Sequence, residues 1–102
     1  MVEDRGLSDA IIAYLGKGRS AFPRSDEAAV AELAGATGVD GAELLARVRS
    51  AVDEMMSIQI DWSANTLSQG GREAQRVMAE RHAELGQDAL EALYWMFTYN
   101  WR

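Results

Sequence analysis

The chain has 102 residues with no cysteine and one proline, and 48% of its residues are hydrophobic. These values predict a single folded domain over residues 1–102, and they argue against disorder, a disulfide framework and thiol chemistry. The net charge of −6 disfavours nucleic acids and anionic membrane surfaces as partners, because both are negatively charged.

A short helix is predicted at the start of the chain. Ser8 is a good N-cap residue, and Leu7 and Ile12 then have the spacing of a hydrophobic staple around it. Gly16 and Gly18 predict the end of this helix. A loop containing the only proline, Pro23, is expected to follow.

A second short helix and a long third helix are predicted next. Ser25 is expected to cap the second helix, and Gly35 and Gly38 are expected to end it. Asp40 is expected to cap the third, with Glu43 at the spacing of a capping box. No breaker follows before the double glycine, so one helix is expected to continue as far as Leu67, with a kink near residue 57. Its apolar stripe repeats every three or four residues and comprises Leu44, Val48, Val52, Met55, Ile58 and Trp62.

Two further helices are predicted after Gly70 and Gly71, which are interpreted as a break. The fourth is expected over residues 72–85 and the fifth over residues 87–99. Strand signals are scarce throughout the chain. The predicted fold class is therefore all-α: a compact bundle of about five helices, two short N-terminal ones and three longer antiparallel ones.

The fifth helix is unusually aromatic, since five of the eight aromatic residues lie in the last nine positions. Leu90, Leu93, Phe97 and Trp101 share one helical face, which predicts that they belong to the core, as Trp62 does in the helix-three stripe. One interpretation of the other aromatics is that this helix is central and covered on most sides. The alternative is a subunit or partner interface, because Trp and Tyr are typical interface anchors. Its candidate residues are Tyr94, Trp95 and Tyr99, together with Trp101.

The negative charge is concentrated in the middle of the chain. Residues 25–61 contain eight acidic and two basic residues. Asp53, Glu54 and Asp61 are the candidates for an acidic face that a basic protein would recognise. A solvated acidic surface with no partner is the alternative.

Residues 26–52 also have the order helix, glycine-containing turn, helix, which is similar to a helix-turn-helix. Arg47 and Arg49 would then be the DNA contacts. The local charge opposes this hypothesis, because the reading helix would begin with Asp40 and Glu43. A DNA-binding regulator therefore stays an alternative hypothesis.

The candidate chemical groups do not form a recognisable catalytic or cofactor site. His82 is the only histidine, and Glu80 and Glu84 lie two residues from it, a spacing at which helical side chains do not face each other. No glycine-rich nucleotide loop is present. The prediction is a protein that is not an enzyme, with no cofactor and no metal.

The location and function are predicted from what remains. The sequence has no apolar run near the ~20 residues of a membrane span, and its acidic N-terminus does not resemble a secretion signal. A cytoplasmic protein is therefore expected, and the nine-to-one excess of Arg over Lys is associated with bacterial proteins. The function hypothesis is an acidic interaction module, such as a small inhibitor, immunity-type or accessory protein that binds a basic partner and also self-associates. A structural homo-oligomeric subunit is the other alternative.

Overall fold

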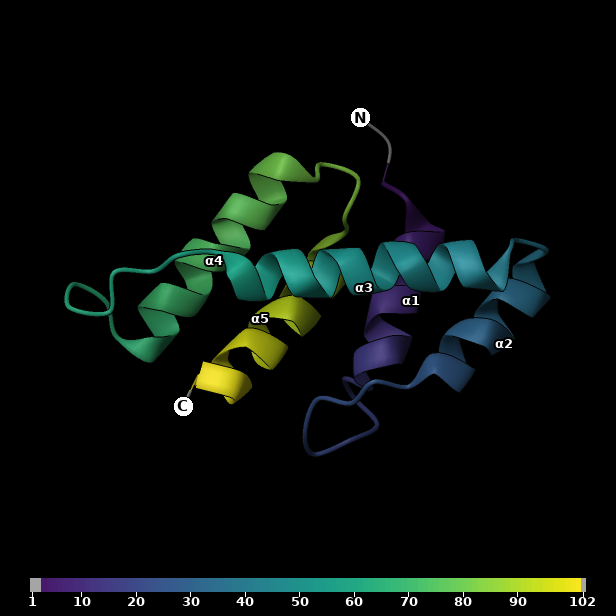
Figure 1. Cartoon of the computed structure of the whole chain (residues 1–102), viewed down its shortest axis with the longest axis horizontal. Helices are drawn as coiled ribbons and strands as arrows, with labels where there is room; N and C mark the ends of the chain where they lie inside the picture. The colour runs from purple at the N-terminus through teal and green to yellow at the C-terminus, as the bar shows by residue number, and fades with distance from the viewer. Residues whose placement is uncertain (1–2, 102) are drawn as a thin grey trace.

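The structure, a computed structural model that describes residues 3–101, contains five α-helices and, over those residues, no β-strand (Figure 1). The predicted all-α fold, with two short helices before three longer ones, is confirmed. The acidic N-terminus that does not resemble a secretion signal includes Met1 and Val2. These two residues lie outside the described residues. The helices are α1 (Arg5–Leu15), α2 (Glu27–Thr37), α3 (Gly41–Ser57), α4 (Leu67–Arg81) and α5 (Gln87–Trp101).

Helix α1 lies between α2 and α5 and contacts α2, α3 and α5. Helix α3 lies across α1 and α5, and α4 packs mainly against α5 (Figure 1). The resulting molecule is flattened, with extents of 45 × 32 × 19 Å. Helix α1 separates α2 from α5. Helix α2 therefore lies at one end of the molecule, and α4, which packs on α5, lies at the other.

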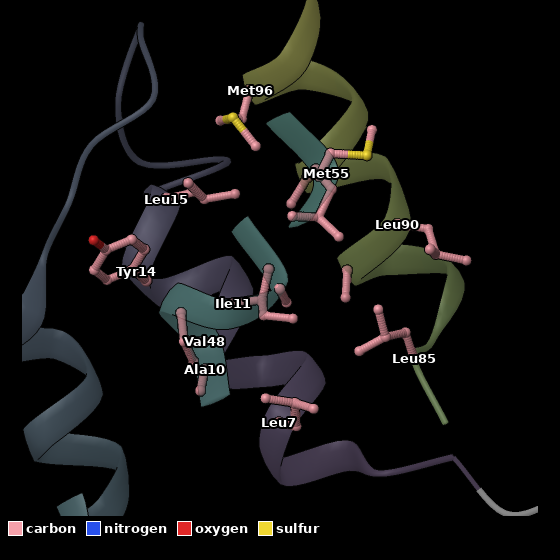
Figure 2. Packing of buried hydrophobic residues seen from close by; sticks show 14 of the residues in the cluster. Leu7, Ala10, Ile11, Tyr14, Leu15, Val48, Met55, Leu85, Leu90 and Met96 are labelled. Atoms are coloured by element: carbon pink, nitrogen blue, oxygen red, sulfur yellow. The ribbon is translucent and has the colours of Figure 1, made fainter. Parts of the chain in front are cut away.

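The core is formed where the apolar faces of α1, α3 and α5 meet. Figure 2 shows Ile11 of α1, Met55 of α3 and Leu90 of α5 grouped in one cluster. Ile11 and Met55 are completely buried, as is Phe97 of α5. The stripe predicted for the third helix is therefore the buried face of α3 up to Met55.

Aspartates, not serines, begin the first two helices. The Asp4 carboxylate accepts a hydrogen bond of 3.0 Å from the Leu7 N–H, so α1 starts one turn earlier than predicted. The Asp26 side chain caps α2 in the same way, one residue after the predicted Ser25. The predicted cap at Ser8 and its staple are thus wrong, because an acceptor lies upstream. Asp40 does cap α3, as predicted.

Ser8 instead connects α1 to the start of α5. Its side chain is completely buried, and its hydroxyl accepts a hydrogen bond of 3.0 Å from the N–H of Gly86. The N–H of Asp4 donates to the carbonyl of Glu84 at 2.7 Å in the same region. Two contacts therefore fasten the first turn of α1 to the connection between α4 and α5.

Replacing Ser8 by alanine is expected to lower the free energy of unfolding by about 1–3 kcal/mol, because the buried Gly86 N–H would lose its acceptor. Urea denaturation would measure the change. Ser50→Ala is the matched control: Ser50 is exposed on α3, and its replacement is expected to stay within about 0.5 kcal/mol of the wild type. Equal stabilities for the two variants would contradict the prediction.

Helix α3 ends ten residues before the predicted limit. Ile58 has the extended conformation (φ −66°, ψ 127°), and the chain continues without helix to Thr66. Ile58 and Ile60 are half-buried and pack against the core, which favours the extended path. Thr66 and Gln69 then form a reciprocal capping box that starts α4. The prediction of one helix to Leu67 is wrong, because the chain leaves the helix at Ile58 and this capping box starts a new one.

The double glycine lies inside α4 and does not break it. A methyl group at Gly71 would lie 2.6 Å from Thr98 Cγ2 and 2.8 Å from Tyr94 Cε1, both on α5. At Gly70 it would lie 2.5 Å from Cζ3 of Trp62. The two glycines therefore permit close packing, and the predicted fourth helix at 72–85 is corrected to residues 67–81.

Candidate functional site

A surface hollow lies where the first turns of α1 and α3 meet the last turn of α2. It has a volume of about 430 Å³. Its apolar lining is Leu7, Leu33, Val39 and Leu44. Its charged lining is Asp4, Asp9, Asp40, Glu43 and Arg47. We call this hollow the acidic groove, since four carboxylates line it against one guanidinium.

The turn between α2 and α3 forms one wall of the acidic groove. Gly38 ends α2 with a left-handed conformation (φ 74°), which glycine adopts without strain. Val39 follows and is 50% exposed, an unusual environment for a valine. The Asp40 carboxylate accepts hydrogen bonds from the first N–H groups of α3. The cap that starts α3 thus also supplies negative charge to the groove.

The carboxylates of the acidic groove differ in how they are paired. The Leu7 N–H and then the Arg47 guanidinium, 2.8 Å away, hold the pKa of Asp4 below its usual value. Asp9 pairs with Arg5 at the edge of the groove. Within residues 3–101, Glu43 forms no ion pair, and it is exposed. A negative excess therefore remains available to a ligand.

A second hollow of about 330 Å³ continues the acidic groove, sharing Leu7, Glu43 and Arg47 with it. It contains Glu54, one of the predicted partner-binding residues. The hydrogen bond from His82, 2.7 Å long, and then the one from Arg81 lower the pKa of Glu54. Glu54 is thus already paired on its own surface.

The prediction that His82 and Glu84 do not face each other is wrong. Helix α4 ends at Arg81, so the helical spacing rule does not apply to the residues that follow. His82 Nδ1 lies 3.3 Å from the Glu84 carboxylate. In the part of the chain that the structure describes, no group of three or more His, Asp or Glu side chains could hold a metal ion.

The other predicted acidic residues take separate local roles. Asp53 is exposed on α3. Asp61 lies in the loop before α4, where the hydroxyl and N–H of Ser63 donate to its carboxylate and lower its pKa. Asp53, Glu54 and Asp61 therefore lie in three different environments and do not form one acidic face.

The aromatic residues of α5 divide between the interior and the surface. Phe97 is completely buried, and Trp95 is half-buried against the core. Tyr94 is also half-buried, with the Arg72 guanidinium 3.7 Å from its ring centroid. Tyr99 is 38% exposed. Of the residues proposed for an interface, Tyr94 and Trp95 are thus largely covered by the chain itself.

Trp101 and Trp62 were predicted to be core residues, but they are 48% and 37% exposed. Trp62 lies on the loop after α3, and its ring centroid is 5.5 Å from that of Trp101. Both rings also contact buried Phe97, with centroids 6.2 Å and 6.1 Å away. The pair therefore covers the end of the core instead of filling it.

The arginines of the helix-turn-helix alternative both have acidic partners. Arg47 pairs with Asp4 of α1, and Arg49 pairs with Glu27 of α2. A phosphate would have to compete with these carboxylates. The arrangement of α2 and α3 adds no observation that favours DNA binding.

Comparison with protein-family models, with curated proteins and with solved structures found no match to this chain. Among residues 3–101, no helix has both the length and the apolar character needed to cross a membrane. The candidate site is therefore defined by its own geometry, within an all-α fold of five helices.

Sequence reasoning did not find the acidic groove. Its lining comes from three helices, and the contact of α1 with the α2–α3 turn is not encoded in any local spacing. Val39 is not a separate signal, because it follows the left-handed Gly38 and its N–H donates to the Ala34 carbonyl, a helix end at which an apolar residue is common.

Proposed function

We propose that this chain is a non-catalytic protein-interaction module that binds a basic partner protein through the acidic groove. The observation that supports this proposal is the combination of an apolar lining with four carboxylates on one surface hollow. Apolar contact supplies affinity, and the carboxylates select cationic side chains and speed association. The net charge of −6 acts in the same direction.

A specific form of this proposal is a small bacterial inhibitor or accessory protein. An acidic protein of this size can cover the basic active-site surface of a nuclease-like toxin, because charge complementarity favours that encounter. The basic partner would insert an apolar side chain beside Val39 and place Lys or Arg next to Glu43. This form predicts a stoichiometric complex that weakens as salt increases.

Capture from cells of the native source would test the proposal with three immobilised baits. The wild type is expected to retain a basic protein in stoichiometric amount. Glu43→Lys is expected to lose it, because a like charge at the contact costs several kcal/mol, or roughly a hundredfold in affinity. Glu32→Lys has the same charge change on α2 but lies outside the groove, so it is expected to retain the partner.

Two results would contradict the proposal. One is the absence of any stoichiometric protein on the wild-type bait. The other is equal retention by Glu43→Lys and Glu32→Lys, which would mean that net charge alone determines binding.

A second candidate function is that of a structural homo-oligomeric subunit. The exposed rings of Trp62, Tyr99 and Trp101 at one end of the molecule favour it, because Trp and Tyr are frequent interface anchors. Light scattering would test it. Trp101→Ala should abolish the self-association, whereas added salt should leave the self-association of the wild type unchanged. A monomeric wild type at high concentration would exclude it.

A further inference from the structure

The connection between α1 and α2 is a basic loop with an exposed aromatic side chain. Residues 16–25 contain Lys17, Arg19 and Arg24 and no carboxylate. Phe22 between them is 53% exposed, more than any other large hydrophobic residue of the described chain. Figure 1 shows this loop projecting beyond the end of α1. We call residues 16–25 the basic loop.

The basic loop has a defined conformation. The N–H groups of Arg19 and Ser20 donate to the Gly16 carbonyl, and the Arg24 N–H donates to the Leu15 carbonyl. The Ser20 hydroxyl donates to the Phe22 carbonyl at 2.7 Å. A loop fixed in this way loses little conformational entropy when it binds. Phe22 is therefore already exposed in a defined position before binding.

The basic loop and the acidic groove complement each other. The basic loop contains three cationic residues and an exposed phenyl ring, with the Arg19 guanidinium donating to the Ala13 carbonyl at 3.0 Å. Four carboxylates and one guanidinium line the apolar hollow. The loop and the groove lie at opposite ends of α1, a helix of 11 residues whose length is about 16 Å, so they do not meet within one molecule.

We propose that the basic loop of one copy binds in the acidic groove of a second copy, with Phe22 against the apolar lining and Arg24 beside Glu43. This inference rests on the proposed function, since it uses the same groove, and it names a second copy of the chain as the occupant. A volume of about 430 Å³ accommodates one aromatic side chain with its neighbours.

The contact is head-to-tail, because two different surfaces meet. Each bound copy still presents an unoccupied loop and an unoccupied groove, so association continues into open chains and does not stop at a dimer. One loop in one groove buries less than the roughly 1,000 Å² of a stable interface, so a Kd of about 0.1–1 mM is expected. A tighter basic partner would displace the second copy from the groove.

Sedimentation equilibrium of the wild type would test the inference up to about 2 mM, above the expected Kd. The weight-average mass is expected to rise continuously past that of a dimer at about 0.05 M NaCl, and to fall at about 0.5 M NaCl. Glu43→Lys and Phe22→Ala, each with the wild-type circular dichroism spectrum, are expected to weaken association at least tenfold. Glu32→Lys should associate like the wild type.

Mixing the two defective variants is the decisive experiment. Phe22→Ala retains an intact groove, and Glu43→Lys retains an intact loop, so their mixture is expected to form a 1:1 heterodimer that cannot extend. A symmetric dimer through the aromatic residues of α5 would not respond in this way, and it would be lost in Trp101→Ala instead.

The possible outcomes separate this inference from the proposed function. A monomeric wild type over the whole range would overturn the inference, as would a mixture that stays monomeric or association that is lost only in Trp101→Ala. If the inference fails while partner capture is still lost in Glu43→Lys, the proposed function stands and the groove binds a different basic protein. If capture fails as well, both are wrong.

Discussion

Replacing Phe97 by alanine is expected to lower the free energy of unfolding by about 3–5 kcal/mol. Phe97 is completely buried in α5, and the rings of Trp62 and Trp101 lie directly over it. Its removal leaves a cavity that those exposed rings cannot fill without losing their own contacts. Chemical denaturation monitored by circular dichroism would measure the loss, and the denaturant dependence should stay unchanged if the fold is retained.

Trp101→Ala is the matched control for this prediction, since it removes an aromatic ring four residues further along α5. Trp101 is 48% exposed, so its loss is expected to cost about 1 kcal/mol, mainly from the contact with Trp62. A cost for Trp101→Ala as large as for Phe97→Ala would show that the end of α5 is part of the core, contrary to its observed exposure.

Replacing Gly71 by alanine is expected to destabilise the protein by up to about 2 kcal/mol, although alanine is the better helix former. The added methyl group would lie 2.6 Å from Thr98 Cγ2 and 2.8 Å from Tyr94 Cε1. Thr98 is β-branched, and the Tyr94 ring lies beneath Arg72, so neither group moves easily. The overpacking cost of about 1–3 kcal/mol therefore exceeds the helix-propensity gain of about 1 kcal/mol.

Gly35→Ala is the internal comparison, because its sign is expected to be opposite. Gly35 also lies within a helix, α2, but no neighbouring atom would lie within 4 Å of the added methyl group. This substitution is expected to stabilise the protein by about 0.5–1 kcal/mol. Thermal or urea unfolding of both variants would measure the difference. A stabilised Gly71→Ala variant would mean that α4 and α5 are not in close contact there.

The sequence predicted the number and type of elements because the apolar residues of α1, α3 and α5 repeat with helical spacing over several turns. It predicted boundaries less well, because more than one residue near each boundary can cap a helix. Both Asp4 and Ser8 could cap the first helix, and both Asp26 and Ser25 could cap the second. In the structure the two aspartates provide the caps. The hydroxyl of Ser8 accepts from the N–H of Gly86, just before α5 and 78 residues away, which no local rule indicates.

The double glycine illustrates a different limit. A glycine pair resembles a helix end when only the sequence is considered, yet here it reflects contacts with Trp62, Tyr94 and Thr98. These partners become neighbours only after α5 packs on α4. The same reason explains the error for Trp62, which follows the periodicity of α3 but lies beyond its end.

The candidate site depended on tertiary structure even more strongly. The acidic composition of the middle segment was visible in the sequence, and Asp40 and Glu43 were recognised as a cap signal. Their convergence with Asp4 and Leu7 of α1 requires the packing of three helices. The acidic residues selected from the sequence were those of the long third helix, and only Glu54 lies next to the groove.

The position of α1 between α2 and α5 has a consequence for how the chain acquires its structure during synthesis. Helix α1 is made before α5, but its buried face, with Ile11 and Leu15, is covered in part by α5. The Ser8 hydroxyl likewise has no donor until Gly86 has been made. Local helix formation can begin on the ribosome, whereas the core closes only when α5 has emerged. A polypeptide halted before residue 87 would therefore expose the apolar surface of α1 to chaperones and proteases.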